Sequence, residues 1–309
     1  MKSQKSVVIF WDPSLYFFPK LSSIIFKAFN IPRNKLLRLI FHISFRFNLP
    51  IVQLFYGDWK NEIKDADIVV LFEWGYNKQI ESYIRNVNKH CKVHLYYWNI
   101  VDDNNKVLLE KFSEHNHIWT TDKNDCKKYN LRYNSLFFTK RMNLPLKTID
   151  WDIIFVGIEK NRGEYLVELK EKMLVNNMKC KFHIVKNQRR SNNDELDQHM
   201  SIQYVDYATY LDMVSRSKAI LDIVRPGQIA LTQRSMESIF FRKKMVTNSE
   251  DIKNYDFYNQ NNIFVISNNI NDINFESLYN FLNTPYVEIE QSIIDSYDYE
   301  GWIKRFLDN

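Results

Sequence analysis

The chain has 309 residues, with 42 Lys and Arg against 37 Asp and Glu, and 45% of its residues are hydrophobic. This length is ample for two domains, and the 26% charged and 15% aromatic residues exclude an intrinsically disordered chain. The 3 cysteines, Cys91, Cys126 and Cys180, are widely spaced, which argues against a disulfide framework or a thiolate zinc site and favours a reducing compartment.

Short β-branched and aromatic runs alternate with helical stretches in the first half, which is the pattern of a parallel α/β sheet. We expect strands over residues 7–11, 51–56, 67–72, 93–98 and 117–121. We expect helices over residues 19–30, 77–89, 105–115 and 124–129. The strands are apolar on both faces, as expected when helices cover both sides of a sheet.

Residues 17–47 form a basic, aromatic-rich segment inside this half. No acidic residue occurs between Asp12 and Asp58. Residues 1–140 carry 21 basic and 13 acidic side chains, a net charge of +8, whereas residues 141–309 carry 21 and 24, a net of −3. Such a segment can contact anionic lipid, can follow a nucleic-acid backbone, or can be a solvated helix face above a buried aromatic one. Charged and polar residues interrupt it too often for a transmembrane span.

Residues 139–151 contain Pro145 and no clear period, so we interpret them as a hinge between domains. The pattern then restarts, with strands expected over 152–156, 181–185, 219–224, 245–247 and 263–266. A turn is expected at Gly157 and a loop over 188–199. Helices are expected over 164–176, 207–218, 236–242 and 299–307. The fold class predicted is α/β, with two Rossmann-like, doubly wound parallel-sheet domains facing a cleft.

The expected strand ends in the second half are rich in groups that bind a diphosphate. Gly157 permits close backbone approach, and the N–H groups that start the helix after residue 228 would face an anion. Glu237 could accept hydrogen bonds from ribose hydroxyls. Arg162, Arg225 and Arg234 could each form an ordinary surface ion pair instead. Their occurrence at or after successive strand ends nevertheless favours a ligand site. The nucleotide-binding residues expected from these strand ends are Gly157, Lys160, Arg162, Lys186, Arg225, Gly227, Gln228, Arg234 and Glu237.

Several motifs of other enzyme classes are missing. No G-x-G-x-x-G follows a strand, no G-x-x-x-x-G-K-[ST] occurs, and there is no G-x-S-x-G, so dehydrogenases, P-loop NTPases and α/β-hydrolases lose their main support. The histidine pair His115 and His117 lacks a carboxylate-ringed partner, and the two D-x-D patterns precede strands instead of following them. We therefore expect no metal site.

Four segments carry a resemblance to a known family: YATYLDMVSRSKAILD at 207–222, GQIALTQRSME at 227–237, KKMVTN at 243–248 and YDFYN at 255–259. Together they resemble bacterial glycosyltransferases of the GT-B type found in capsule and lipopolysaccharide synthesis loci. The resemblance implies a carboxy-terminal domain that binds a nucleotide-sugar without a metal. Thr232-x-Arg234-x-x-Glu237 matches the segment that contacts donor phosphates and ribose, and Gly157 matches the glycine after the first strand. The resemblance, which begins at Tyr204, thus adds Tyr204 and Thr232 to the expected donor-binding residues.

Two further features bear on this resemblance. The final helix with Trp302 looks like the one that crosses back to the first domain. Many relatives carry two glutamates about eight residues apart in the donor loop, whereas Ile229 stands at that distance before Glu237. That departure leaves the usual contact to the sugar hydroxyls, and retaining chemistry, without support. The domains implied are an acceptor domain over 1–145, a donor domain over 146–295 and a crossing helix over 296–309.

The function predicted is metal-independent transfer of a sugar from a nucleotide diphosphate donor, with a UDP-sugar as the leading candidate, to a glycan that is lipid-linked. Asp12 and Glu73 end strands of the first domain and are the candidates for the catalytic base. We expect no cofactor besides the nucleotide-sugar, which is a co-substrate, and no nucleic-acid partner. We also expect a cytoplasmic location, with peripheral membrane contact through residues 17–47. A sugar-nucleotide epimerase and a non-catalytic scaffold of the same architecture are the alternatives.

Overall fold

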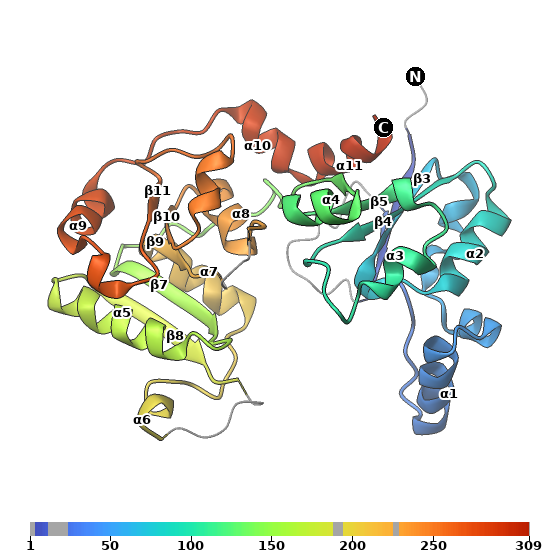
Figure 1. Ribbon diagram of the computed structural model, residues 1–309, viewed down its shortest axis with the longest axis horizontal. Helices are drawn as coiled ribbons and strands as arrows, with labels where there is room; N and C mark the ends of the chain where they lie inside the picture. Colours follow the sequence, from blue (N-terminus) through green and yellow to red (C-terminus); the bar gives the residue numbers. More distant parts are fainter. Residues whose placement is uncertain (1–3, 12–23, 188–193, 225–228, 309) are drawn as a thin grey trace. The chain divides into compact units, whose positions relative to one another are not determined.

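The computed structural model describes residues 4–11, 24–187, 194–224 and 229–308. Their contacts divide the chain into two compact units: unit 1 consists of Met1–Thr139 and Tyr297–Asn309, and unit 2 of Lys140–Ser296. Each unit has one sheet, and all strand pairs within both sheets are parallel (Figure 1). The predicted α/β class with two Rossmann-like parallel sheets is therefore confirmed.

Unit 1 has a six-stranded sheet in the order β2-β1-β3-β4-β5-β6. Its strands are β1 Ser6–Phe10, β2 Ile24–Lys27, β3 Ile68–Phe72, β4 Lys92–Tyr97, β5 Ile118–Thr120 and β6 Arg132–Tyr133. Its helices are α1 Lys35–Arg46, α2 Lys78–Val87, α3 Val107–Lys111, α4 Lys123–Tyr129 and α11 Tyr299–Leu307. Asn77 and Asp122 cap the starts of α2 and α4 by accepting backbone N–H hydrogen bonds. Strand β3 is buried along its whole length, which explains its unbroken apolar sequence.

Two predicted elements of unit 1 are wrong. Residues 51–56 are not a strand, because Pro50–Phe55 forms a 3₁₀-helix, η1, with proline at its start. With three residues per turn, Val52 and Phe55 fall on the same buried side, while Leu54 is 77% exposed. The helix expected over 19–30 is also wrong for its described part, because Ile24–Lys27 forms β2 beside β1. Residues 19–23 lie outside the described residues.

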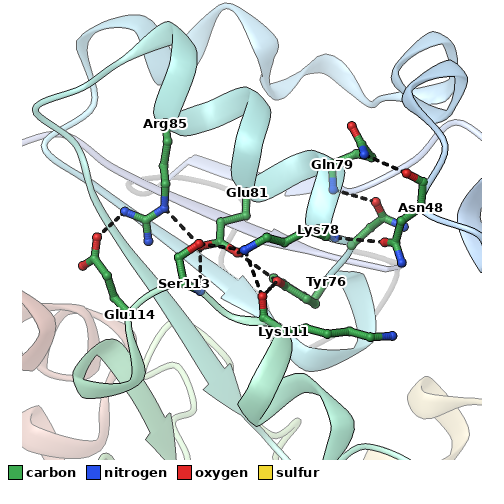
Figure 2. A network of polar contacts seen from close by, with 10 residues as sticks. Asn48, Tyr76, Lys78, Gln79, Glu81, Arg85, Lys111, Ser113 and Glu114 are labelled. Atoms are coloured by element: carbon green, nitrogen blue, oxygen red, sulfur yellow. Dashed lines mark hydrogen bonds and ion pairs between the residues drawn. The ribbon is translucent and has the colours of Figure 1, made fainter.

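A buried carboxylate anchors α2 (Figure 2). Glu81 is 0% exposed and accepts hydrogen bonds from the Tyr76 hydroxyl at 2.8 Å, Lys78 Nζ at 3.0 Å and Arg85 Nε at 3.0 Å. It also accepts the backbone N–H of Ser113 at 3.0 Å. Because the residues come from α2, the loop before it and the segment after α3, the network ties these parts of unit 1 together.

The last helix, α11, packs in the core of unit 1. Trp302 and Phe306 are both 0% exposed. The Trp302 ring lies 4.5 Å from that of Phe137 and 5.1 Å from that of Tyr96, measured between centroids. Asn134 Nδ2 donates to the Trp302 carbonyl at 3.2 Å. The i, i+4 spacing of Trp302 and Phe306 places both rings on the side that faces the core.

Unit 2 has a five-stranded sheet in the order β11-β10-β9-β7-β8. Its strands are β7 Trp151–Ile158, β8 Cys180–Val185, β9 Ser217–Asp222, β10 Lys244–Thr247 and β11 Ile263–Val265. Its helices are α5 Gly163–Val175, α6 Asp194–Asp197, α7 Tyr207–Ser215, α8 Gln233–Phe240, α9 Phe275–Asn283 and α10 Gln291–Tyr297, whose last residue is counted with unit 1. Apolar side chains of α5 and α9 share a core cluster with Ile153 and Phe155 of β7.

The expected loop over 188–199 contains α6 in its described part, and the helix expected over 207–218 ends at Ser215 because Lys218 belongs to β9. None of the described helices combines the length and the apolar character needed to cross a bilayer.

Candidate functional site

The strand order of unit 2 defines where a ligand would bind. Strand β7 lies between β8 and β9, and the chain runs from β7 out to β8 on one side and from β9 out to β10 on the other, so the direction of the connections reverses between β7 and β9. In doubly wound sheets, ligands bind beyond the carboxyl ends of the two strands at such a switch point. Here those ends are Ile158 and Asp222, and the N-terminus of α8 follows β9 in the chain.

Gly157 does not form the turn that we expected. It lies inside β7, where it is paired with Ile184 of β8. A Cβ atom at this position would lie 2.5 Å from Nη2 of Arg234. The missing side chain therefore makes room for the Arg234 guanidinium against the strand, which is a different reason for glycine from the one that the sequence suggested.

Arg234 is held at this position by three contacts. Nη2 donates to the Val156 carbonyl at 2.5 Å, and Nη1 lies 3.6 Å from Oδ1 of Asp222. The guanidinium also lies over the Phe155 ring, 5.1 Å from its centroid. The guanidinium of Arg162 lies 5.5 Å from the same ring centroid. Two arginines predicted to bind the donor thus contact the same ring of β7, and the side chain of Arg234 is 20% exposed.

The start of α8 is fixed to the end of β9. Thr232 caps the helix in a capping box with Ser235, and its hydroxyl donates to Oδ2 of Asp222 at 2.6 Å. Asp222 is 2% exposed and connects this cap to Arg234. Among the described residues, the buried amide oxygen and nitrogen of Gln233 have no hydrogen-bond partner. Sequence reasoning missed Asp222 and Gln233; an acidic residue closing an apolar strand, ten residues before Thr232, was the available signal for Asp222.

Glu237 lies one turn further along α8 and is 2% exposed. Its carboxylate accepts hydrogen bonds from the Tyr210 hydroxyl at 2.5 Å and the Tyr207 hydroxyl at 3.3 Å. Burial raises the pKa of Glu237 to about 7, against the opposing effects of Tyr210 and the charge of Arg234. Both tyrosines belong to α7, so the carboxylate fastens α8 to α7.

The other predicted donor residues have varied surroundings. Lys160 is exposed and has a left-handed backbone, with φ of 46°. Lys186 forms an ion pair with Asp197 of α6. Tyr204 is 63% exposed. Arg225, Gly227 and Gln228 lie outside the described residues.

Of the two candidate bases in unit 1, Asp12 lies outside the described residues, and Glu73 is 7% exposed at the end of β3. Glu73 accepts hydrogen bonds from the backbone N–H groups of Trp98 at 3.0 Å and Asn99 at 3.1 Å, and from Asn99 Nδ2 at 3.1 Å. These bonds fasten the end of β3 to the end of β4. Burial raises the pKa of Glu73 to about 7, although the hydrogen bonds oppose this rise.

Within the described residues, no group of three or more His, Cys, Asp or Glu side chains is arranged to hold a metal ion. His115 contacts the Tyr129 carbonyl and His117 pairs with Glu114, so the two histidines have separate partners.

No protein-family description matches the sequence, and no curated protein matches it. Solved structures are similar in fold. Sucrose-phosphate synthase from Thermosynechococcus elongatus superposes with a TM-score of 0.54 and 10% identity, covering 98% of this chain and 87% of that one. A glycosyltransferase from Rickettsia africae ESF-5 gives a TM-score of 0.50 and 11% identity, covering 93% of this chain and 84% of that one. At these identities the comparison shows the fold alone: the chain has the two-domain Rossmann-like fold of these enzymes.

Proposed function

We propose that this protein is a glycosyltransferase that moves a sugar from a nucleotide diphosphate donor to a hydroxyl group of a glycan. The observation that carries the proposal is the position of Arg234, which stands in the first turn of α8, is held by the Val156 carbonyl and Asp222, and contacts the same Phe155 ring as Arg162. Guanidinium groups and helix N-termini both favour phosphate oxygens, and doubly wound sheets bind ligands at such a switch point, which supports a diphosphate as the ligand. The likeness in fold to two glycosyl-transferring enzymes supports the same conclusion.

In the proposed reaction, the acceptor hydroxyl oxygen attacks the anomeric carbon of the sugar. The bond from that carbon to the diphosphate breaks, and the diphosphate leaves with the electron pair. Arg234, Lys160 and Arg225, together with backbone N–H groups of α8, would stabilise the charge that develops on it without a divalent ion. If the reaction inverts the anomeric centre, Asp12 or Glu73 would take the acceptor proton.

The donor we favour is a UDP-sugar. The acceptor proposed is a lipid-linked glycan of surface polysaccharide synthesis, handled at the inner face of the cell membrane. Two features support this: the basic net charge of residues 1–140 would attract an anionic lipid surface, and the segments at 207–259 resemble capsule and lipopolysaccharide enzymes.

A thermal-shift screen with UDP, GDP, CMP and dTDP and their sugars tests the proposal. A nucleotide that binds only the folded protein stabilises it by about 2.7 kcal/mol at a hundredfold excess over Kd. We expect one nucleotide series to raise Tm, and the matching nucleotide-sugar to be consumed only when an acceptor glycan is present. The absence of a shift with every nucleotide would contradict the donor site. Conversion of the donor to an epimer without acceptor would instead identify an epimerase.

A further inference from the structure

Helix α1 of unit 1 has an apolar side that is not used in the core. Its buried side packs through Phe41 and Ser44, which are 0% and 1% exposed. A second apolar row lies on the exposed part of the helix surface. The residues of this row are Leu36, Leu39, Ile43 and Phe47, with exposed fractions of 66%, 56%, 45% and 65%. Their spacing of three and four residues, continued to the C-cap, aligns them along one side of the helix.

A basic row runs beside this apolar row. It consists of Lys35, Arg38, His42 and Arg46, each one residue before a member of the apolar row and all exposed. Among the described residues, none of these four side chains forms an ion pair with a carboxylate, and no acidic residue occurs between Asp12 and Asp58. The uncompensated charge of Lys35, Arg38 and Arg46 therefore accompanies exposed leucine, isoleucine and phenylalanine side chains along the whole helix.

This combination of charge and apolarity identifies the kind of partner. An apolar surface of a partner protein would accept the apolar row but would leave the adjacent cations without counter-charges. A nucleic-acid backbone would match the cations but would leave four large aliphatic and aromatic side chains in water. An anionic lipid surface satisfies both rows, because its headgroups pair with the cations and its acyl boundary receives the apolar side chains. Helix α1 stands at one end of unit 1 in Figure 1, beyond the strands of the sheet.

We propose that the α1 surface formed by these two rows, defined as the α1 face, binds anionic membranes peripherally, with the helix axis parallel to the bilayer plane. Within the basic segment 17–47, the membrane contact is thus assigned to the α1 face, and the lipid that it binds is anionic. The proposal does not depend on sugar transfer, since binding to vesicles needs neither donor nor acceptor.

Sedimentation of the full-length chain with phospholipid vesicles tests the proposal. We expect binding to vesicles that mix phosphatidylcholine with phosphatidylglycerol, and weak binding to phosphatidylcholine alone. Arg38→Gln/Arg46→Gln removes two cations and is expected to weaken binding about 30-fold to the anionic vesicles. Leu39→Ser/Ile43→Ser is expected to weaken binding more than about tenfold. Raised salt should reduce binding of the wild-type protein, because it screens the cations.

Matched variants in unit 2 control for a general loss of charge or apolarity. Leu174→Ser/Val175→Ser alters side chains of α5 that are 48% and 79% exposed, and Lys172→Gln/Lys179→Gln removes two exposed cations. Both should bind vesicles as the wild type does, and circular dichroism should show that all variants are folded.

The proposal is overturned if the chain does not bind the anionic vesicles, or if both α1 variants bind as strongly as the controls. It is also overturned if light scattering shows a dimer that only Leu39→Ser/Ile43→Ser disrupts, because a second copy would then occupy the α1 face. Tight binding to RNA without binding to vesicles would have the same consequence.

Discussion

Arg234 and Gly157 form one unit at the scale of single residues. The guanidinium occupies the space that a Cβ on Gly157 would need, because the two would be 2.5 Å apart. Strand β7 cannot move away easily, since it is paired with both β8 and β9. The glycine therefore serves the placement of an arginine in this protein.

We predict that Arg234→Ala weakens binding of the cognate nucleotide diphosphate by about 10- to 100-fold, the usual effect of losing a charge-assisted hydrogen bond. Gly157→Ala should weaken binding in the same direction by displacing the guanidinium. The double variant should bind no more weakly than the worse single variant, because both changes remove one interaction. Calorimetric titration measures all three. Arg216→Ala, at the amino-end side of β9, is the control and should bind normally. Additive losses in the double variant would separate Gly157 from Arg234.

The raised pKa of Glu237 leads us to expect that the free energy of unfolding depends on pH. The pKa is raised by burial from 4.5 to about 7, so between these values the folded protein binds a proton that the unfolded chain has released. Stability from this group is therefore highest below about pH 4.5 and falls as the pH rises to about 7, after which it stays constant. The loss is on the order of 1–3 kcal/mol.

Glu237→Gln removes this titration while keeping an oxygen that can accept from Tyr210. We predict that Tm of the wild type falls more than Tm of Glu237→Gln between pH 5 and pH 7.5. Scanning calorimetry at several pH values measures both. Parallel pH profiles for the two proteins would show that the Glu237 carboxyl is not the group that titrates.

At the scale of elements, local pattern predicts what local contacts decide. The limits expected for the last helix, 299–307, match α11, because Trp302 and Phe306 repeat at helical spacing between polar residues. The strand expected over 51–56 is wrong, since β-branched residues favour strands only when a neighbouring strand pairs with them, and η1 forms its hydrogen bonds locally. For β2 the partner β1 exists, and it overrides the helical interpretation of Ile24–Lys27.

The candidate donor site of unit 2 could likewise be predicted only in part from the sequence. The strand-end pattern indicated Arg162, the helix expected after β9 indicated Arg234, and the family resemblance indicated Thr232. Arg234 and Thr232 stand at the start of α8, and Arg162 precedes α5. The buried contacts of Asp222, Tyr207 and Tyr210 depend on which side chains meet across separate elements, and one sequence does not reveal that. The roles of the predicted site residues in binding and catalysis remain predictions.

The packing of helix α11 leads to a prediction about the stability of unit 1. Trp302 is 0% exposed and packs on Phe137 and Tyr96, so Trp302→Ala should destabilise unit 1 by about 3–5 kcal/mol through lost contacts and the cavity that remains. Urea unfolding followed by circular dichroism measures the change. Lys304→Ala alters an exposed residue of the same helix and should stay within about 0.5 kcal/mol of the wild type. An equal effect of both variants would mean that the helix, and not the Trp302 contacts, determines stability.

At the scale of the whole molecule, net charge and local charge differ in an informative way. Residues 141–309 carry a net charge of −3, although they include the arginines of the candidate donor site. Long-range attraction therefore does not favour an anionic donor in this half, and its binding must come from the local groups at the start of α8. Residues 1–140, with a net charge of +8, would instead attract an anionic surface.

This local neutralisation predicts how the complete enzyme responds to metal removal. If guanidinium and backbone N–H groups stabilise the departing diphosphate, they replace the divalent ion that would otherwise carry this charge. Sugar transfer by the full chain should then keep its rate in EDTA, and added Mg²⁺ or Mn²⁺ should not raise it more than about twofold, which corresponds to less than 0.5 kcal/mol in the barrier. Transfer assays with matched ionic strength measure this, because salt alone weakens charged contacts. Activity that disappears in EDTA and returns with Mn²⁺ would show that a metal ion, and not Arg234 with its neighbours, balances the diphosphate charge.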